Sequence, residues 1–210
     1  EKLILPQENI DRIMACVRRV LDRETQDSIY LELGLGDVCR KGRGAVILLW
    51  GPPGTGKTMT AECASDMCHR AIIKTGIENV GRPDALRKEM ENTFRKSRKY
   101  NAFLLLDEVD AFIKKRGDHP IMDETTAIFL RCIEQYDGVL FMTTNLIGQI
   151  DQAVFSRCHI IIPYEAPNHD MRRQIWMSKL DGPILAALIG GGFLRRRRAV
   201  RRIGAHRPHD

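Results

Sequence analysis

The feature that most constrains this chain is a glycine-rich segment that lies between an apolar run and a helix-prone one. Residues 51–58 read Gly-Pro-Pro-Gly-Thr-Gly-Lys-Thr and fit the pattern G-x-x-x-x-G-K-[ST] in full. The apolar run at residues 45–50 is short enough for a buried strand, and residues 57–68 read as a helix. Glycines let backbone N–H groups turn inward around phosphates, and the N-terminus of the following helix adds partial positive charge. The segment therefore predicts a strand, a phosphate-binding loop and a helix, in that order.

The side chains of this loop have separate expected tasks. Lys57 reaches the outer phosphates as a point charge, and the Thr58 hydroxyl ligates Mg²⁺. A chance glycine-rich turn is the alternative interpretation, and the flanking strand and helix argue against it. The residues expected to bind the nucleotide are Gly51, Pro52, Pro53, Gly54, Thr55, Gly56, Lys57, Thr58, Met59 and, further along, Asp107.

A pair of acids follows the apolar segment at residues 103–106. Because successive side chains of a strand point in opposite directions, Asp107 and Glu108 face different parts of the strand end. Asp107 is expected to hold Mg²⁺ through water, and Glu108 to polarise the water that attacks the terminal phosphate. The alternative is that two acids end the strand because loops are polar. Asp110 is assigned no chemistry, and a turn or a salt bridge is expected there.

Two further polar residues stand where a nucleotide site needs them. Asn145 follows the apolar strand at residues 139–142, so its amide can bond the terminal phosphate and the attacking water; an asparagine that starts a turn is the alternative. Arg157 precedes the short strand at residues 160–162, and its planar, permanent charge suits phosphate. It is interpreted either as an arginine finger that acts on a neighbouring subunit or as a surface residue that caps a helix end. The residues assigned to catalysis are Lys57, Glu108, Asn145 and Arg157.

Apolar runs alternate with helix-prone segments along most of the chain. Each run is apolar on both faces, which is typical of a parallel sheet covered by helices on both sides, with ligands bound beyond the carboxyl ends of the strands. Strands are expected at residues 45–50, 71–74, 103–106, 139–142 and 160–162, and helices at 7–24, 57–68, 83–98, 123–136 and 169–180. We divide the chain into an N-terminal helix and linker (1–44), a core that holds the nucleotide motifs (45–180) and a basic tail (181–210), expected to be disordered beyond about residue 190.

The formal charge of +6 belongs mostly to that tail. Residues 181–210 hold seven arginines against two aspartates, a net of +5, which leaves +1 for the other 180 residues. The composition therefore supports no nucleic-acid role beyond the arginines at residues 195–202. These are interpreted as a solvated tail, with nuclear import or RNA binding as alternatives.

The rest of the composition is that of an intracellular protein. There is no run of about 18 apolar residues and no basic head followed by an apolar stretch, so neither a membrane span nor a secretory signal is expected. Six cysteines without a CxxC pair are typical of reduced thiols, and no zinc site is expected. These features do not separate cytoplasm from nucleus.

The phosphate loop, the acid pair, Asn145, and Arg157 within Asp-x-Ala-x-x-x-Arg together resemble the AAA family of ATPases over residues 6–180. The loop and the acids match the family's Walker A and Walker B motifs. Three stretches, residues 46–58, 103–109 and 140–157, are especially similar to a group of large, poorly characterised fungal AAA proteins.

The resemblance implies the AAA form of the P-loop NTPase fold, a three-layer sandwich with a five-stranded parallel sheet. It implies ATP and Mg²⁺ as ligands, with Asn145 at the sensor 1 position and Arg157 at the arginine-finger position. It also implies a ring-shaped homo-oligomer, usually a hexamer, because such sites are completed between subunits, and an unknown protein or other macromolecule as substrate.

Three departures from the family pattern affect this interpretation. Cys158 and His159 follow Arg157, so a single finger must suffice. Asn79 stands where many members carry an aromatic residue that grips polypeptide. The small helical lid is expected to be largely absent, because the tail has no amphipathic pattern. The leading hypothesis is an ATPase that remodels a macromolecular partner, and the alternative is an ATP-dependent assembly scaffold with little turnover.

Overall fold

A computed structural model describes residues 5–32, 44–76, 83–113, 120–146, 148 and 150–179. Leu5–Ala166 form one compact unit that holds every described strand, and the helix α7 (His169–Lys179) belongs to a second unit. The predictions for the tail at 181–210, for the lid and for the loop that contains Asn79 lie outside the described residues. No helix in the described part of the chain has the length and apolar character needed to cross a membrane.

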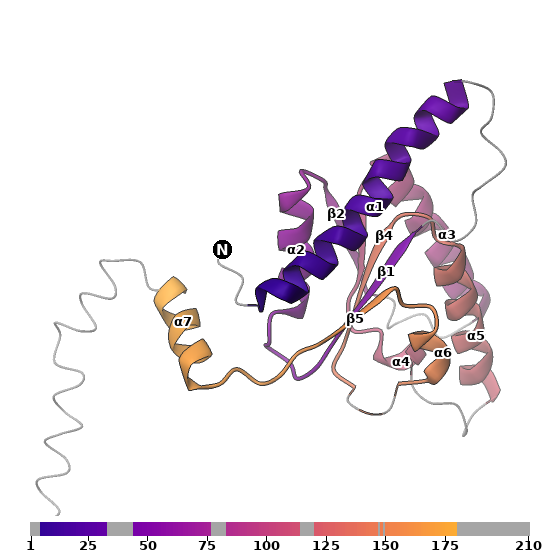
Figure 1. Ribbon diagram of the computed structural model, residues 1–210. Helices are drawn as coiled ribbons and strands as arrows, with labels where there is room; N and C mark the ends of the chain where they lie inside the picture. Colours follow the sequence, from indigo (N-terminus) through magenta and orange to yellow (C-terminus); the bar gives the residue numbers. More distant parts are fainter. Residues whose placement is uncertain are drawn as a thin grey trace, which may run out of the picture. The chain divides into compact units, whose positions relative to one another are not determined.

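Five parallel strands form one sheet, in the order β2-β3-β4-β1-β5 (Figure 1). The strands are β1 (Ala45–Trp50), β2 (Ile72–Thr75), β3 (Phe103–Leu106), β4 (Val139–Thr144) and β5 (Ile160–Pro163). This confirms the predicted five-stranded parallel sheet. Since β4 pairs with β1 on one side and with β3 on the other, it separates the strand before the glycine-rich loop from the strand before the acids.

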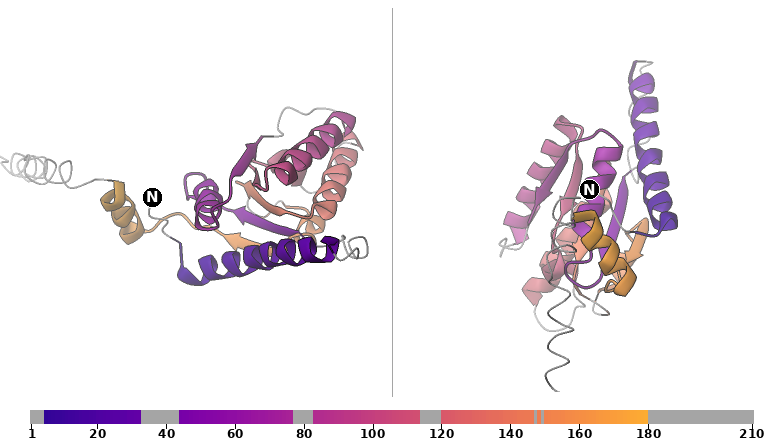
Figure 2. Two further views of the ribbon diagram at one scale, coloured as in Figure 1. Left: turned by 90° about the horizontal axis from the view of Figure 1, so that it is seen from above. Right: turned by 90° about the vertical axis from the view of Figure 1, so that its left-hand side faces the viewer.

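Helices cover both faces of the sheet, as Figure 2 shows for α1 on one side and for α3 and α5 on the other. The helices of this unit are α1 (Gln7–Glu32), α2 (Lys57–Met67), α3 (Pro83–Lys99), α4 (Asp110–Ile113), α5 (Pro120–Gln135) and α6 (Gln152–Phe155). Alternate strand residues point to opposite faces. In β1, Ile47 and Leu49 therefore pack with α1 and α2, whereas Val46 and Leu48 pack with the helices of the other face.

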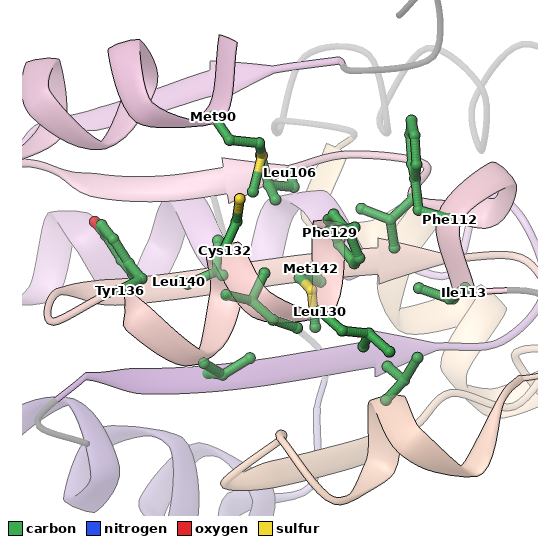
Figure 3. Packing of buried hydrophobic residues seen from close by; sticks show 14 of the residues in the cluster. Met90, Leu106, Phe112, Ile113, Phe129, Leu130, Cys132, Tyr136, Leu140 and Met142 are labelled. Atoms are coloured by element: carbon green, nitrogen blue, oxygen red, sulfur yellow. The ribbon is translucent and has the colours of Figure 1, made fainter. Parts of the chain in front are cut away.

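The core between the sheet and the pair α3 and α5 contains more buried residues than the core on the other face. Figure 3 shows part of this larger core. Phe112 stacks on Phe129 with ring centroids 5.4 Å apart, and both rings are buried. At the other end of α5 the Tyr136 hydroxyl lies 2.6 Å from the Ser97 hydroxyl, which donates to a backbone carbonyl. Each such buried large side chain stabilises the fold by about 1.5–3 kcal/mol, which fixes the strand ends that carry the polar residues below.

The structure corrects several predicted boundaries. Helix α1 continues to Glu32 rather than ending at residue 24, and α5 begins at Pro120 rather than at residue 123. Strand β4 includes Thr143 and Thr144, which were expected beyond its end. The four-residue helices α4 and α6 were missed because one helical turn is too short to show an apolar period.

Candidate nucleotide site

The glycine-rich loop leaves the carboxyl end of β1 and leads into α2. Gly51 has φ +147°, and a Cβ there would lie 2.2 Å from the Tyr164 carbonyl oxygen, so no larger residue fits without a backbone shift. Gly56, the residue that precedes α2, has φ +92°, in the left-handed region that favours glycine. These conformations place the first turn of α2, with its free N–H groups, at the mouth of the loop.

Lys57 is folded back under the loop. Its Nζ donates to the carbonyl oxygens of Gly51 at 2.8 Å and Pro52 at 2.7 Å, and to Asn145 Oδ1 at 2.9 Å. Burial lowers the pKa of Lys57, and the charges of nearby carboxylates, Asp110 foremost, act in the opposite direction. The three acceptors hold the ammonium group at the site, next to the loop where phosphates are expected.

Asp107, directly after β3, meets a hydroxyl from each side. Thr58 Oγ1 donates to the Asp107 carboxylate, at 3.1 Å from Oδ1 and 3.2 Å from Oδ2. The buried Thr143 hydroxyl donates to Asp107 Oδ1 and accepts the Glu108 backbone N–H at 3.0 Å. One threonine of β4 therefore fixes both acids, a role that sequence reasoning missed. The signal available was a hydroxyl side chain at the end of an otherwise apolar strand.

Glu108 has a backbone conformation that is uncommon for its residue type. Its φ is +54°, and its side chain is exposed, in contrast to the partly buried Asp107. Left-handed non-glycine residues cost about 1–3 kcal/mol and persist where the surrounding structure holds them. Here the bonds from Glu108 N to Thr143 Oγ1 and from Val109 N to the Thr143 carbonyl (3.0 Å) hold the chain.

Asp110 bonds a turn, which is one of the two roles expected for it, but the turn belongs to another element. Its Oδ1 accepts from the Thr144 hydroxyl at 2.5 Å and from the Asn145 backbone N–H at 3.2 Å. The aspartate that begins α4 is thus bonded to the end of β4, where Asn145 leaves the sheet.

These residues surround one cavity of about 430 Å³ at the carboxyl ends of β1, β3 and β4. The lining residues are Pro53, Gly54, Thr55, Gly56, Lys57, Thr58, Met59, Glu62, Asp107, Glu108, Thr143 and Asn145. Of the predicted site residues, only Gly51, Pro52 and Arg157 do not line it. Gly51 and Pro52 lie beneath it and hold Lys57 through their carbonyl groups.

Arg157 lies elsewhere. It lines a separate cavity of about 390 Å³, together with Gly44 just before β1, Val46 within β1 and Tyr136 just after α5. This cavity is therefore at the amino ends of the strands. Arg157 Nη1 donates to the Ala153 carbonyl of α6 at 2.9 Å, which is the helix-end contact considered as the alternative to a catalytic role.

Arg157 also contacts a hydroxyl and an acid, and its Nη1 donates to Ser156 Oγ at 3.4 Å. Arg157 Nε lies 3.3 Å from Glu134 Oε2, an ion-pair distance at an angle that does not make a hydrogen bond. The Glu134 side chain is 63% exposed and the Arg157 side chain 30%, so solvent screens this pair. Next to it, burial raises the pKa of the Cys158 thiol to about 12, which makes that thiol unreactive near neutral pH.

The oxygen atoms of Thr58 and Asp107 fit a Mg²⁺ ion, which takes one or two protein ligands and completes its shell with phosphate and water. In the part of the chain that the structure describes, no group of three or more His, Cys, Asp or Glu side chains is placed to hold a metal ion.

The sheet order together with the loop, lysine and acid pair defines the fold of a P-loop nucleotide-binding protein. The family model described as "ATPase family associated with various cellular activities (AAA)" matches residues 47–166, more than half of the chain. The chain belongs to the AAA family of ATPases.

Known proteins of the family resemble the chain over part of their length. Human ATPase family AAA domain-containing protein 3B is 28% identical over 156 residues, which cover 70% of this chain and 24% of that protein. The chain thus spans about a quarter of the length of this relative. The similarity to fungal AAA proteins is not tested by this match and stays a prediction.

Two solved structures share the fold. A TRIP13-containing complex from E. coli MS115-1 ("HORMA:CdnC:Trip13") has a TM-score of 0.63 at 20% identity and covers 86% of this chain and 69% of that one. The FIGL-1 AAA domain in complex with ADP has a TM-score of 0.52 at 21% identity, covering 70% and 49% of the two chains.

Proposed function

We propose that the chain binds Mg·ATP in the cavity beside the glycine-rich loop and hydrolyses it to ADP and phosphate. The observation that carries this proposal is the convergence of residues from three strand ends on one cavity. Lys57 and Thr58 follow β1, Asp107 and Glu108 follow β3, and Asn145 follows β4. A site that only bound phosphate would need the first two and not the others.

The loop and α2 bind the triphosphate. Backbone N–H groups of the loop and of the first turn of α2 bond the phosphate oxygens, and Lys57 neutralises their charge. Thr58 and Asp107 would hold the Mg²⁺ ion, which stabilises the charge that develops on the phosphate oxygens when bound. Lys57 is already bonded to Asn145 Oδ1, so the cation and the amide lie together where the terminal phosphate is expected.

Glu108 takes the catalytic base position. Its exposed carboxylate lines the cavity, and its backbone is fixed by Thr143, so it is placed to accept a proton from an attacking water. Asn145 orients that water and the terminal phosphate through its amide. Both groups act in the in-line attack of water on the terminal phosphorus, with ADP as the leaving group.

Arg157 completes the site of a neighbouring copy in this proposal. Because it lies at the amino ends of the strands, it cannot contribute to the cavity of its own chain, which is at the carboxyl ends. A ring of copies, such as a hexamer, would bring the amino-end cavity of one chain to the nucleotide of the next. There the guanidinium would exchange Glu134 for phosphate oxygens as the arginine finger.

The energy of ATP hydrolysis drives work on another macromolecule. The chain acts inside the cell, in cytoplasm or nucleus, to remodel a protein or other macromolecular partner. Assembly without turnover is the second candidate, and it is favoured by the presence of Cys158 and His159 where a second arginine is common in the family.

Steady-state phosphate release tests the proposal. Wild type should release phosphate from ATP only with Mg²⁺, and Glu108→Gln should lower the rate by about 100-fold or more while ATP binding survives. Glu89→Gln, at an exposed acid of α3 that does not line the cavity, is the matched control and should retain the rate. If wild type binds ATP and releases no phosphate even at concentrations that favour oligomers, the enzyme proposal fails and the scaffold remains.

A further inference from the structure

The turn from β4 to Asn145 is held by a carboxylate from another element. Asp110 Oδ1 accepts both the Thr144 hydroxyl, at 2.5 Å, and the Asn145 backbone N–H, at 3.2 Å. The Thr144 hydroxyl oxygen in turn accepts the Leu146 N–H at 3.0 Å. Thr144 is fully buried, so the two bonds of its hydroxyl are not easily replaced by water.

These bonds provide acceptors for backbone N–H groups where the chain leaves the sheet. At Thr144 the ladder with β1 ends, so the next N–H groups have no strand partner. Asp110 accepts the Asn145 N–H, and the Thr144 hydroxyl that it also bonds accepts the Leu146 N–H, so residues 144–146 have one fixed path. Because Asn145 Oδ1 is 2.9 Å from Lys57 Nζ, that path also sets where the amide lies in the cavity.

We propose that Asp110 is the positioning residue for Asn145. It holds the Asn145 amide in register with Lys57 by accepting hydrogen bonds from the Thr144 side chain and the Asn145 backbone, and it does not itself touch the nucleotide. The role in turnover rests on the proposed hydrolysis of ATP, whereas the hold on residues 144–146 does not.

Asp110 has two properties whose effects on the site must be measured separately: it accepts hydrogen bonds, and it carries a negative charge. Asp110 also acts on Lys57 through space, since its charge opposes the effect of burial on the lysine pKa. Asp110→Asn removes the charge and keeps an Oδ1 acceptor at the same place. Asp110→Ala removes both, so the two variants divide the two effects.

The first experiment measures kcat and ATP affinity for both variants. Asp110→Ala should lower kcat by about 10- to 100-fold through displacement of Asn145, with a much smaller change in the Kd for ATP. Asp110→Asn should recover most of the loss. Equal loss in the two variants would overturn the proposal, because charge rather than hydrogen bonding would then be responsible. Glu89→Ala, at an exposed acid of α3, is the charge-matched control.

A double-mutant cycle tests whether Asp110 acts through Asn145. In an Asn145→Ala background, Asp110→Ala should cause little further loss of kcat, because the group that it positions is gone. Losses that multiply would overturn the proposal. Both variants should also be compared in melting temperature. If both melt at a lower temperature and only Asp110→Ala loses kcat, reduced stability does not explain the loss, which supports the positioning role.

Amide hydrogen exchange on the nucleotide-free protein gives a readout that does not depend on activity. Exchange at residues 145 and 146 should be faster in Asp110→Ala than in wild type, and close to wild type in Asp110→Asn. If wild type hydrolyses no ATP, the proposed function fails and this measurement alone decides the inference. Unchanged exchange in Asp110→Ala would overturn it.

Discussion

The two ends of the sheet carry cavities of similar size and different character. The cavity at the carboxyl ends, about 430 Å³, is formed by side chains that bond one another across β1, β3 and β4. The cavity at the amino ends, about 390 Å³, holds one arginine whose acidic partner is largely exposed to solvent. At the carboxyl end the polar side chains bond one another within the chain. At the amino end the Arg157 guanidinium faces an acid that is mostly exposed to solvent.

This difference shows which kind of partner each end suits. Lys57 has three acceptors within hydrogen-bond distance, so a ligand at the carboxyl end meets a preformed site. Arg157 has a carbonyl, the Ser156 hydroxyl at 3.4 Å and a screened ion pair, which in the proposed ring a phosphate group with stronger charge would replace. If the two ends are halves of one composite site, variants at opposite ends should complement each other. If packing sets their stability, substitutions at the two ends should change the free energy of unfolding by different amounts.

Mixing two inactive variants gives the largest expected effect. Arg157→Ala and Glu108→Gln should each lower phosphate release by about 1,000-fold, and their mixture should recover activity, since a mixed oligomer pairs an intact carboxyl end with an intact arginine. The measurement is phosphate release against mixing ratio.

In the control mixture both substitutions lie at the carboxyl ends of the strands. Glu108→Gln mixed with Lys57→Ala should stay inactive, because no pair of copies then has an intact nucleotide cavity. Absence of recovery in the first mixture, with oligomers verified by mass, would mean that Arg157 has only its helix-end contact.

Loss of one hydroxyl should damage the carboxyl end specifically. Thr143→Val leaves the Asp107 carboxylate and the Glu108 N–H without their shared partner, and it should lower kcat by about 10- to 100-fold. The free energy of unfolding should fall by about 1–3 kcal/mol, the cost of a buried unpaired donor. Thr143→Ser keeps the hydroxyl and should restore kcat in the same assay; failure to do so would point to packing of the methyl group instead.

Two glycines of the loop should differ in what a methyl group costs. Gly51→Ala meets the Tyr164 backbone and should lower the free energy of unfolding by about 3 kcal/mol or more. Gly54→Ala has open space around it and should cost about 1 kcal/mol, from its φ of +72° alone. Urea denaturation of both variants measures the difference. Equal costs would show that the Tyr164 backbone moves to make room for the methyl group at residue 51.

The smallest expected effect is a pH dependence at the amino end. The Val46 N–H donates to His159 Nδ1 at 3.1 Å, which requires a neutral ring, and burial followed by the charge of Arg19 lowers the pKa of His159. A lowered folded-state pKa means that this stabilisation is present above the ordinary histidine pKa and is lost as the pH falls through the folded-state pKa.

Thermal unfolding between neutral and mildly acidic pH measures this dependence. His159→Asn, whose side-chain oxygen accepts the same bond without titrating, should flatten the curve. A wild-type curve that matches that of the variant would show that the histidine bond contributes nothing to stability.

The sequence predicted the carboxyl end more fully than the amino end, for a physical reason. The loop and the acids are local patterns, and β1 and β3 are short apolar runs whose bounds were predicted to the residue. Thr143 and Asp110 were missed because their roles depend on partners 35 or 36 residues away. Arg157 was recognised as a candidate, but its pairing with Glu134 could not be predicted, since no local pattern joins α5 to the segment before β5.

The sequence by itself determined that this chain has a glycine-rich loop between a strand and a helix and an acid pair after another buried strand. Backbone freedom at glycine and the alternation of apolar runs act over a few residues, so they can be recognised without a fold. Only the tertiary structure decided that β4 lies between β1 and β3, which brings Asn145 to Lys57 across 88 residues and Thr143 to Asp107. The same sheet order puts Arg157 at the far end, because strand pairing and helix packing, rather than local pattern, set which residues meet.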